Sequence, residues 1–164
     1  MNRLPRWSLA SAVLALAGIG VAGYLTVVAY DQSLLVCGLG DCATVQNSPY
    51  AKIAGVPIAL LGLLMYLVLF AVSLARWRWW RQADVLTSAN AGIALAGTLY
   101  SGYLTYLELF VIHAICQWCV ASAVLVTALF LVESWGLRQV LREEPVSDRG
   151  VGSRSGAHRR QSVL

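Results

Sequence analysis

Residues 109–132 read LFVIHAICQWCVASAVLVTALFLV and contain no Asp, Glu, Lys or Arg. A helix needs about 20 apolar residues to cross the hydrocarbon core of a bilayer, so this run is long enough to span one. Three earlier runs have the same character: residues 7–30, 53–75 and 85–107. Inside lipid the backbone must satisfy its own polar groups, and helices do so within one segment. The sequence therefore predicts an all-α, integral-membrane bundle of four helices.

The composition excludes an ordinary soluble domain, because 59% of the 164 residues are hydrophobic and only 12% are charged. Arg3 and Arg6 precede the first run and resemble the start of a signal peptide. The run is too long for a usual signal peptide, and no small-x-small cleavage site follows it, so we expect a retained first helix. We expect one domain over residues 1–144 and a disordered cytosolic tail over residues 145–164, which are rich in Ser, Gly and Arg.

The formal net charge of +4 is an orientation signal and does not indicate nucleic-acid binding. With four crossings, Lys52 is the only one of the twelve Lys and Arg residues that falls on the side of the first outer loop. The basic residues of the other side are Arg3, Arg6, Arg76, Arg78, Arg81, Arg138, Arg142, Arg149, Arg154, Arg159 and Arg160. The positive-inside rule then places both termini in the cytoplasm, and Trp77, Trp79 and Trp80 fit an aromatic belt there. We expect the chain in a bacterial inner (plasma) membrane.

Four cysteines form two close pairs in the sequence. Cys37 and Cys42 make a C-x4-C in the first outer loop, and Cys116 and Cys119 make a C-x-x-C at the head of the last helix. The predicted orientation puts both pairs at the periplasmic or outer face, where disulfides persist. Cys116 and Cys119 share one helix face, and the helix N-terminus favours a thiolate at Cys116. The two pairs indicate a relay of thiol–disulfide exchange.

Other interpretations of the cysteines stay open at this point. The loop pair could form a plain structural disulfide, and the helical pair could be small apolar core residues. Four cysteines could also hold zinc or pass soft cations, as in a heavy-metal-binding protein or metal carrier. Our interpretation assigns no metal site.

The outer loop contains a predicted lid. Gly38 and Gly40 let a short turn bring the loop cysteines together. Ser48 is a plausible N-cap with Pro49 at the first helical position, which predicts a half-helix over 49–54 across the mouth of the bundle. Gly55 would end this half-helix, and Pro57 would start the second transmembrane helix.

Polar and small residues near the last two helices have weaker signals. His113 lies one turn before Cys116 and could act as a base, although an interfacial histidine explains it as well. Glu108 could accept protons, or it could simply be a solvated helix end. Gly92, Gly97 and Gly102 predict close helix packing in lipid.

The ordered combination of these motifs resembles the vitamin K epoxide reductase family. The resemblance rests on the outer-loop cysteine pair, on residues 47–52 (NSPYAK) leading to residues 55–57 (GVP), and on a C-x-x-C opening the last helix. It covers about residues 8–135. It implies a four-helix bundle around a quinone of the ubiquinone or menaquinone (vitamin K) type, with the half-helix as lid.

The resemblance also implies a role for each site residue. Cys119 would be the cysteine next to the quinone, with Cys116 as its partner. Cys42 would exchange with Cys116, and Cys37 would meet the dithiol of an external protein. Ser48 matches the family's serine or threonine near the quinone head group. The implied activity is a quinone-dependent thiol–disulfide oxidoreductase that promotes disulfide formation.

Two departures from relatives refine this expectation. Many bacterial members carry a fused thioredoxin-like domain after the core, so here we expect a separate thioredoxin-like, extracytoplasmic partner. Vertebrate members have an asparagine and a tyrosine at the positions of Ile58 and Ala123, which favours a plain quinone over an epoxide as acceptor. The other four-helix, quinone-linked disulfide oxidases of bacteria place the C-x-x-C in the first outer loop, the reverse of this order.

Overall fold

Four long helices dominate the computed structural model, which describes residues 6–78 and 83–143. They are α1 (Arg6–Tyr30), α3 (Ile58–Arg78), α4 (Ala83–Leu107) and α5 (Gln117–Glu143). Each carries a stretch long and apolar enough to cross a membrane, so the predicted all-α bundle of four spanning helices is confirmed. The predicted tail over 145–164, and the predicted belt residues Trp79 and Trp80, lie outside the described residues.

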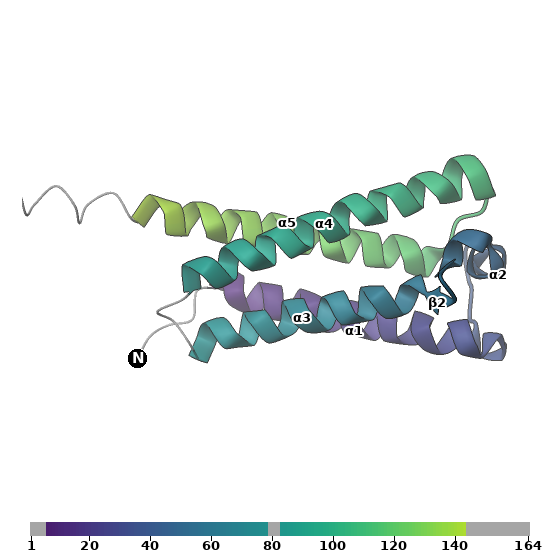
Figure 1. Ribbon diagram of the computed structural model, residues 1–164, viewed down its shortest axis with the longest axis horizontal. Helices are drawn as coiled ribbons and strands as arrows, with labels where there is room; N and C mark the ends of the chain where they lie inside the picture. Colours follow the sequence, from purple (N-terminus) through teal and green to yellow (C-terminus); the bar gives the residue numbers. More distant parts are fainter. Residues whose placement is uncertain (1–5, 79–82, 144–164) are drawn as a thin grey trace, which may run out of the picture.

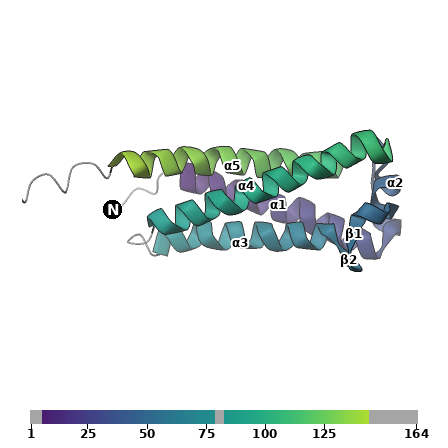
Figure 2. The same ribbon diagram turned by 45° about the horizontal axis from the view of Figure 1, so that its top comes forward.

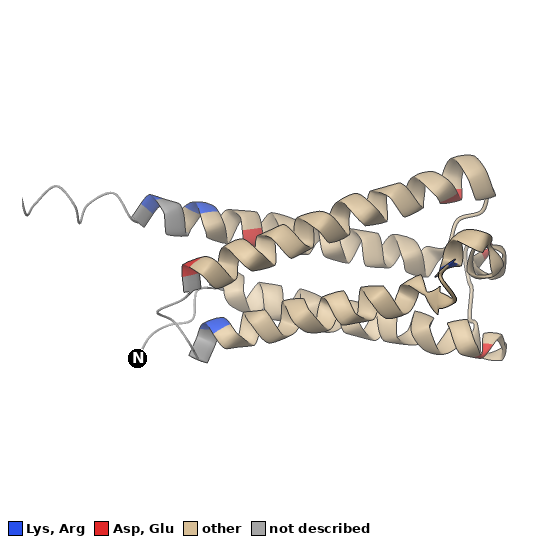
Figure 3. Ribbon diagram, viewed as in Figure 1, with Lys and Arg blue, Asp and Glu red and all other residues tan. Residues whose placement is uncertain are grey.

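The helices lie side by side along one long axis (Figures 1 and 2). α1 packs chiefly against α3 and α5, and α4 packs chiefly against α5. α3 and α4 diverge toward the end of the bundle that carries residues 31–57, which we call the cysteine end. The opposite end holds the start of α1 and the described arginines near the ends of α3 and α5 (Figure 3). We call it the arginine end.

The outer sides of the helices are apolar. Leu9, Val124 and Leu131 expose 61%, 62% and 63% of their surface, although each lies inside a spanning segment. A helix that is apolar on its exposed side needs an apolar surrounding, and lipid chains provide it. The chain is therefore an integral membrane protein.

The middle of the bundle is packed through small residues. The buried cluster there consists of Ala15, Ala22, Tyr66, Leu69, Ala94, Val126 and Leu129. Gly97 was predicted to allow close packing and does so, because a Cβ on it would lie 2.5 Å from the sulfur of Met65. The same prediction is wrong for Gly92 and Gly102, where a Cβ would meet nothing within 4 Å.

A buried polar network ties the four helices together toward the arginine end. Arg76 of α3 forms an ion pair with Glu133 of α5, with Nη2 and Oε1 2.6 Å apart. Asn90 of α4 donates to the same carboxylate at 2.8 Å, and Ser11 of α1 donates to it as well. The Arg76 guanidinium also lies 4.9 Å from the ring centroid of Trp7. Each helix thus contributes a polar side chain to one shared cluster.

The segment between α1 and α3 folds into short elements at the cysteine end. It contains α2 (Cys42–Asn47), a single 3₁₀ turn (Pro49–Ala51) and a two-stranded hairpin of β1 (Lys52–Ile53) and β2 (Val56–Pro57). A further 3₁₀ turn, Gln32–Leu34, follows α1. The short helix is present, but it begins at a cysteine and precedes the position that we predicted.

The predicted half-helix over 49–54 is therefore wrong beyond its first turn. Ile53 pairs with Val56, which leaves Ala54 and Gly55 as a two-residue hairpin turn. Both turn residues have positive φ, 50° and 84°, as a tight hairpin of this type requires. Helical φ values are negative, so this turn stops any helix before residue 54.

The connection from α4 to α5 has an unusual ending. After Leu107 the helix widens into a π-helical turn, Glu108–Ile112, and His113 then adopts a left-handed conformation with φ of 57°. α5 begins at Gln117, a few residues later than the predicted start near Ala114. π-Turns are rare and often occur at functional sites, and this one lies beside the inner cysteines.

Candidate active site

The outer cysteine pair, Cys37 and Cys42, is joined as a disulfide. Cys37 is exposed, whereas Cys42 is completely buried at the start of α2. Asp41 caps this helix, because its carboxylate accepts hydrogen bonds from the hydroxyl and the backbone N–H of Thr44 at 2.6 and 3.0 Å. Those bonds, led by the hydroxyl, hold the pKa of Asp41 below its usual value. One sulfur of the pair therefore faces solvent and the other faces the protein.

The inner pair, Cys116 and Cys119, is present as two free thiols at the head of α5. Cys116 lies just before the helix, is fully buried, and accepts a hydrogen bond from Val120 N–H on its carbonyl at 3.0 Å. A hydrogen bond from the Cys119 thiol, assisted by backbone N–H groups of the first turn, lowers the pKa of Cys116 to about 7. Cys116 is thus prepared to act as a thiolate.

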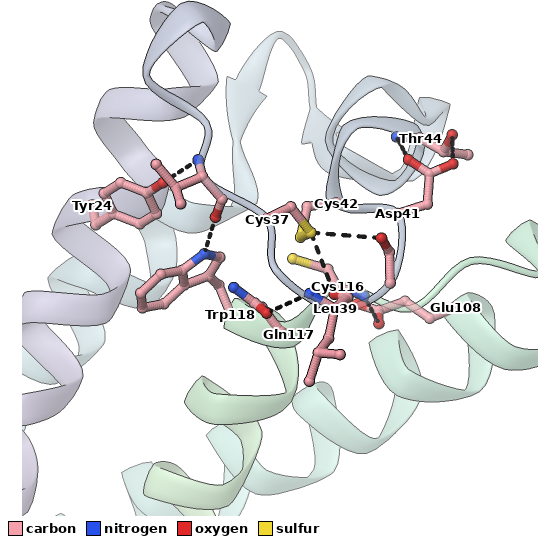
Figure 4. The surroundings of a disulfide bond; sticks show 12 residues. Tyr24, Cys37, Leu39, Asp41, Cys42, Thr44, Glu108, Cys116, Gln117 and Trp118 are labelled. Carbon is pink, nitrogen blue, oxygen red and sulfur yellow. Dashed lines mark hydrogen bonds between the residues drawn. A yellow bond between two sulfur atoms is a disulfide. The ribbon is translucent and has the colours of Figure 1, made fainter.

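The two pairs meet in one small buried cluster at the cysteine end. Cys42, Val45 and Cys116 form its centre, with Cys119 packed against it. Figure 4 shows the Cys116 side chain directed toward the Cys37–Cys42 disulfide. Sulfurs from the first loop and from the last helix are therefore neighbours, although 74 positions (116 − 42) separate Cys42 from Cys116 in the chain.

Backbone contacts hold the disulfide loop against the start of α5. Gly40 pairs with Cys116 in an antiparallel bridge, and Asp41 N–H donates to the Ile115 carbonyl at 3.0 Å. Gly40 has φ of 83°, and a Cβ there would collide with the Ile115 carbonyl oxygen. Only glycine fits this approach. Gly40 was predicted only to form the turn between the cysteines, and its contact with Ile115 is a second reason for a glycine there.

Glu108 connects the π-turn to both inner cysteines. It is only 4% exposed, so the alternative of a solvated helix end is wrong. Its Oε2 accepts from Cys116 N–H at 3.1 Å, and its carboxylate also interacts with the Cys119 thiol. Its carbonyl accepts from the backbone N–H groups of His113 and Ala114. His113 itself is exposed and ends the turn.

A cavity of about 350 Å³ opens beneath the cysteine cluster, at the end where α3 and α4 diverge. Its walls come from α1, α3, α4 and α5, and from α2 with the following turn. Most of the lining is apolar, and the polar groups include Cys119, Glu108 and Ser48. This volume and character are typical of sites for small apolar ligands.

Ser48 lies on the cavity wall, but it does not cap a following helix as predicted. Its hydroxyl donates back to the Val45 carbonyl at 2.8 Å, and its side chain makes no cap bond to the Pro49–Ala51 turn. The serine hydroxyl keeps acceptor capacity toward the cavity. Ile58 also lines the cavity, whereas Ala123 is not among the described lining residues.

The structure also bears on the metal-carrier interpretation. Within residues 6–78 and 83–143, no three His, Cys, Asp or Glu side chains gather in a way that could hold a metal ion. Two of the four sulfurs are bound to each other. A disulfide beside a free thiol suits thiol–disulfide exchange.

The comparison with known families decides the identity. The model of the vitamin K epoxide reductase family matches residues 9–134, which include all four cysteines, Ser48 and Glu108. The chain belongs to the vitamin K epoxide reductase family. Membership confirms the resemblance seen in the sequence and makes the chain a membrane thiol–disulfide oxidoreductase.

Proposed function

We propose that this member of the vitamin K epoxide reductase family oxidises the dithiols of extracytoplasmic proteins and passes their electrons to a quinone. One observation carries the proposal. The disulfide, which faces solvent at Cys37, touches the buried Cys116, and the other sulfur of the inner pair, that of Cys119, lines an apolar cavity. The sulfurs therefore form a continuous path from the surface to the interior of the bundle.

The first step takes place at the exposed sulfur. A thiolate of an external dithiol attacks Cys37, breaks the Cys37–Cys42 bond and forms a mixed disulfide with Cys37. The second external thiolate then attacks its own partner sulfur in this mixed disulfide, which leaves the external protein oxidised and Cys37 and Cys42 as thiols. The exposure of Cys37 and the burial of Cys42 support this choice of target.

The second step transfers the disulfide between the two pairs. Cys42 thiolate attacks Cys116 of an oxidised inner pair, so that a Cys42–Cys116 disulfide forms and Cys119 leaves as a thiolate. Cys37 thiolate then attacks Cys42, which restores the outer disulfide and frees Cys116. The described state, with an outer disulfide and inner thiols, corresponds to the end of this step.

The cavity supports a quinone as the acceptor. When bound, a quinone supplies a site for two electrons and two protons. Cys119 lies on the cavity wall, and its oxidation together with Cys116 regenerates the inner disulfide. Because the Ser48 hydroxyl already donates to Val45, its oxygen can accept from a hydroxyl of the reduced head group, while residues such as Leu25, Ile58 and Leu104 supply apolar contact.

Glu108 is suited to handle the protons. The two thiols of the inner pair lose two protons on oxidation, and those protons must reach the cavity. Among the described lining residues Glu108 is the only carboxylic acid, and it contacts both Cys116 and Cys119. A buried carboxyl next to the reacting groups can accept and return a proton.

The partner and the orientation complete the proposal. The cysteine end faces the periplasm, where a separate thioredoxin-like protein supplies the dithiols, and both termini face the cytoplasm. The concentration of arginines at the other end supports this orientation. A thiol reagent that cannot cross membranes should label reduced Cys37 in intact cells, and labelling only after lysis would contradict the orientation.

The decisive test uses purified protein in detergent or nanodiscs. A reduced thioredoxin-like protein is supplied together with ubiquinone or menaquinone analogues, and reduction of the quinone is followed by absorbance. We expect turnover by the wild type and none by Cys119→Ala. Cys37→Ala should block turnover with the protein dithiol while the pre-reduced inner pair still reduces one quinone. Normal turnover by Cys119→Ala would refute the proposal.

A further inference from the structure

Residues 36–41 form an exposed segment that carries Cys37 of the outer disulfide. We call it the strap, and we ask which contacts hold it in place. Residues 36–40 are all exposed, and the apolar side chains of Val36 and Leu39 expose 68% and 78% of their surface. Hydrophobic burial therefore contributes little to the position of the strap. Its position depends instead on hydrogen bonds to residues outside it.

Besides the backbone contacts of Gly40 and Asp41 with Cys116 and Ile115, two of those hydrogen bonds come from the residues between the inner cysteines. Gln117 Oε1 accepts from the backbone N–H of Leu39 at 2.9 Å, and Trp118 Nε1 donates to the carbonyl of Val36 at 2.9 Å. Both contacts lie close to the sulfurs in Figure 4. The C-x-x-C motif thus supplies more than its cysteines.

Tyr24 of α1 completes the attachment from the other side. Its hydroxyl accepts from the backbone N–H of Val36 at 2.8 Å and donates to the carbonyl of Leu34 at 3.1 Å. Its ring also packs against Trp118, with centroids 4.8 Å apart. The indole and the phenol therefore support each other while both bind the strap.

From these contacts we infer that Gln117, Trp118 and Tyr24 are positioning residues for the internal exchange, holding the strap so that the outer disulfide faces Cys116. The inference rests on the proposed function, because it assigns these residues to the step between the two pairs. None of the three needs to touch the quinone or the external dithiol. They act on the rate and equilibrium of Cys42–Cys116 disulfide formation by fixing one reactant against the other.

The position of these residues in the helix explains why they can do this. Residues at i+1 and i+2 of a helix do not share the face of residue i, so Gln117 and Trp118 point away from the face of Cys116 and Cys119. They can therefore hold the strap on either side while leaving the space between the sulfurs free. At the first turn of α5 they also lie level with the strap (Figure 4).

The test isolates the exchange from the rest of the cycle. In a Cys37→Ala/Cys119→Ala background only Cys42 and Cys116 remain, and their disulfide forms by exchange with oxidised glutathione, which is converted to two reduced glutathiones. The equilibrium ratio gives the effective concentration of one thiol toward the other. This readout needs neither quinone nor partner protein, so it decides the inference even if the proposed function fails.

Three substitutions remove the hydrogen bonds: Gln117→Leu and Tyr24→Phe with little change in size, and Trp118→Phe with the loss of one ring of the indole. Matched controls are Gln139→Leu and Trp135→Phe on exposed positions of α5, and Tyr30→Phe, which is 73% exposed at the end of α1. We expect the effective concentration to fall about fivefold for each hydrogen bond removed, and to stay unchanged in the controls. The Gln117→Leu/Trp118→Phe double variant should lose roughly 25-fold.

A second readout separates positioning from general damage. In a Cys37→Ala/Cys42→Ala background, the pre-reduced inner pair is mixed with a ubiquinone analogue and its single-turnover oxidation is timed. We expect this rate to stay within twofold of wild type in all strap variants. The inference is overturned if the effective concentration matches that of the controls, or if the inner-pair oxidation falls by the same factor.

Discussion

Replacing Glu133 with glutamine should lower the free energy of unfolding of the bundle considerably without altering the redox site. The substitution keeps the shape of the side chain but removes its charge. Arg76, only 6% exposed, then loses the carboxylate that accepts from its two terminal nitrogens at 2.6 and 2.8 Å. A guanidinium cannot release its proton in a protein, so the charge stays buried and unpaired.

The magnitude follows from the burial of the pair. Removal of one partner of a buried ion pair costs about 3–5 kcal/mol. The new amide side chain would still offer one oxygen to Arg76 and Asn90, so we expect the lower part of this range, about 3 kcal/mol. At about 1.4 kcal/mol for each factor of ten, the ratio of folded to unfolded protein falls more than 100-fold.

Reversible unfolding in mixed micelles, followed by circular dichroism, measures this change. Asp84→Asn is the control, because Asp84 is an exposed carboxylate in the first turn of α4 and should change stability by less than about 1 kcal/mol. The double variant Arg76→Met/Glu133→Met removes both charges and should recover most of the loss. A loss below about 1 kcal/mol in Glu133→Gln, or no recovery in the double variant, would contradict the reasoning.

Activity should respond differently from stability in this experiment. Glu133 and Cys119 are 14 residues apart on α5 (133 − 119), or about 21 Å at 1.5 Å per residue. Folded Glu133→Gln protein should therefore reduce quinone at the wild-type rate. A large loss of turnover in fully folded protein would show that the network does more than hold the helices together.

Three further predictions concern the cysteine end. The thiolate absorbance of reduced Cys116 should titrate with a midpoint near pH 7. Cys119→Ala should move this midpoint upward, because the Cys119 thiol donates the hydrogen bond that stabilises the Cys116 thiolate. An unchanged midpoint would contradict this cause. Gly40→Ala should abolish Cys42–Cys116 disulfide formation because its Cβ meets the Ile115 oxygen, whereas Gly55→Ala, with similar φ and open space, should cost only about 1 kcal/mol of stability and leave exchange intact. Glu108→Gln should slow single-turnover oxidation of the inner pair by ubiquinone roughly 100-fold, and an unchanged rate would remove Glu108 from the proton path.

The sequence predicts the spanning helices well because one physical effect, the transfer of uncharged apolar side chains into lipid, decides them. An uncharged run of sufficient length forms a helix in lipid because its backbone must hydrogen-bond within itself, and the four runs correspond to α1, α3, α4 and α5. The ends of the helices are less predictable. Glu108 separates the runs 85–107 and 109–132, but the rest of the π-turn Glu108–Ile112 is as apolar as a helix and differs from one only in hydrogen-bond spacing, so hydropathy does not distinguish them.

The outer segment shows where local rules mislead. Ser48 followed by Pro49 has the pattern of a helix start, yet Asp41 and Thr44 provide a stronger cap seven residues earlier (48 − 41). Once α2 forms from Cys42, the chain reaches Ser48 at its end, and the tight turn at Gly55 ends the segment as a hairpin. Asp41 followed by Thr44 is a helix-cap pattern that the sequence contains. Whether the helix starts after Asp41 or after Ser48 depends on the tertiary packing of Cys42, which the sequence does not give.

The contacts that bring the pairs together could not be derived from spacing alone. Gln117 and Trp118 are read as spacer residues in any C-x-x-C, and their hydrogen bonds go to backbone groups of a loop far away in the chain. The Arg76–Glu133 pair did leave a signal. Arg76 directly follows the uncharged run 53–75, and Glu133 directly follows the run 109–132. Opposite charges at the same end of one membrane bundle are costly unless paired, so their pairing could have been predicted.

The two ends of the bundle are held together in different ways. Toward the arginine end, the Arg76–Glu133 ion pair is buried and is part of a polar network to which all four helices contribute, which fixes the register of the bundle. At the cysteine end, the strap is exposed and attached by a few hydrogen bonds, so it can release the outer disulfide after exchange and rebind it. The proposed relay needs its sulfurs to meet and then to separate. A strap held by weak bonds on a firmly fixed helix end meets both requirements, whereas a strap buried by hydrophobic contacts would meet only the first.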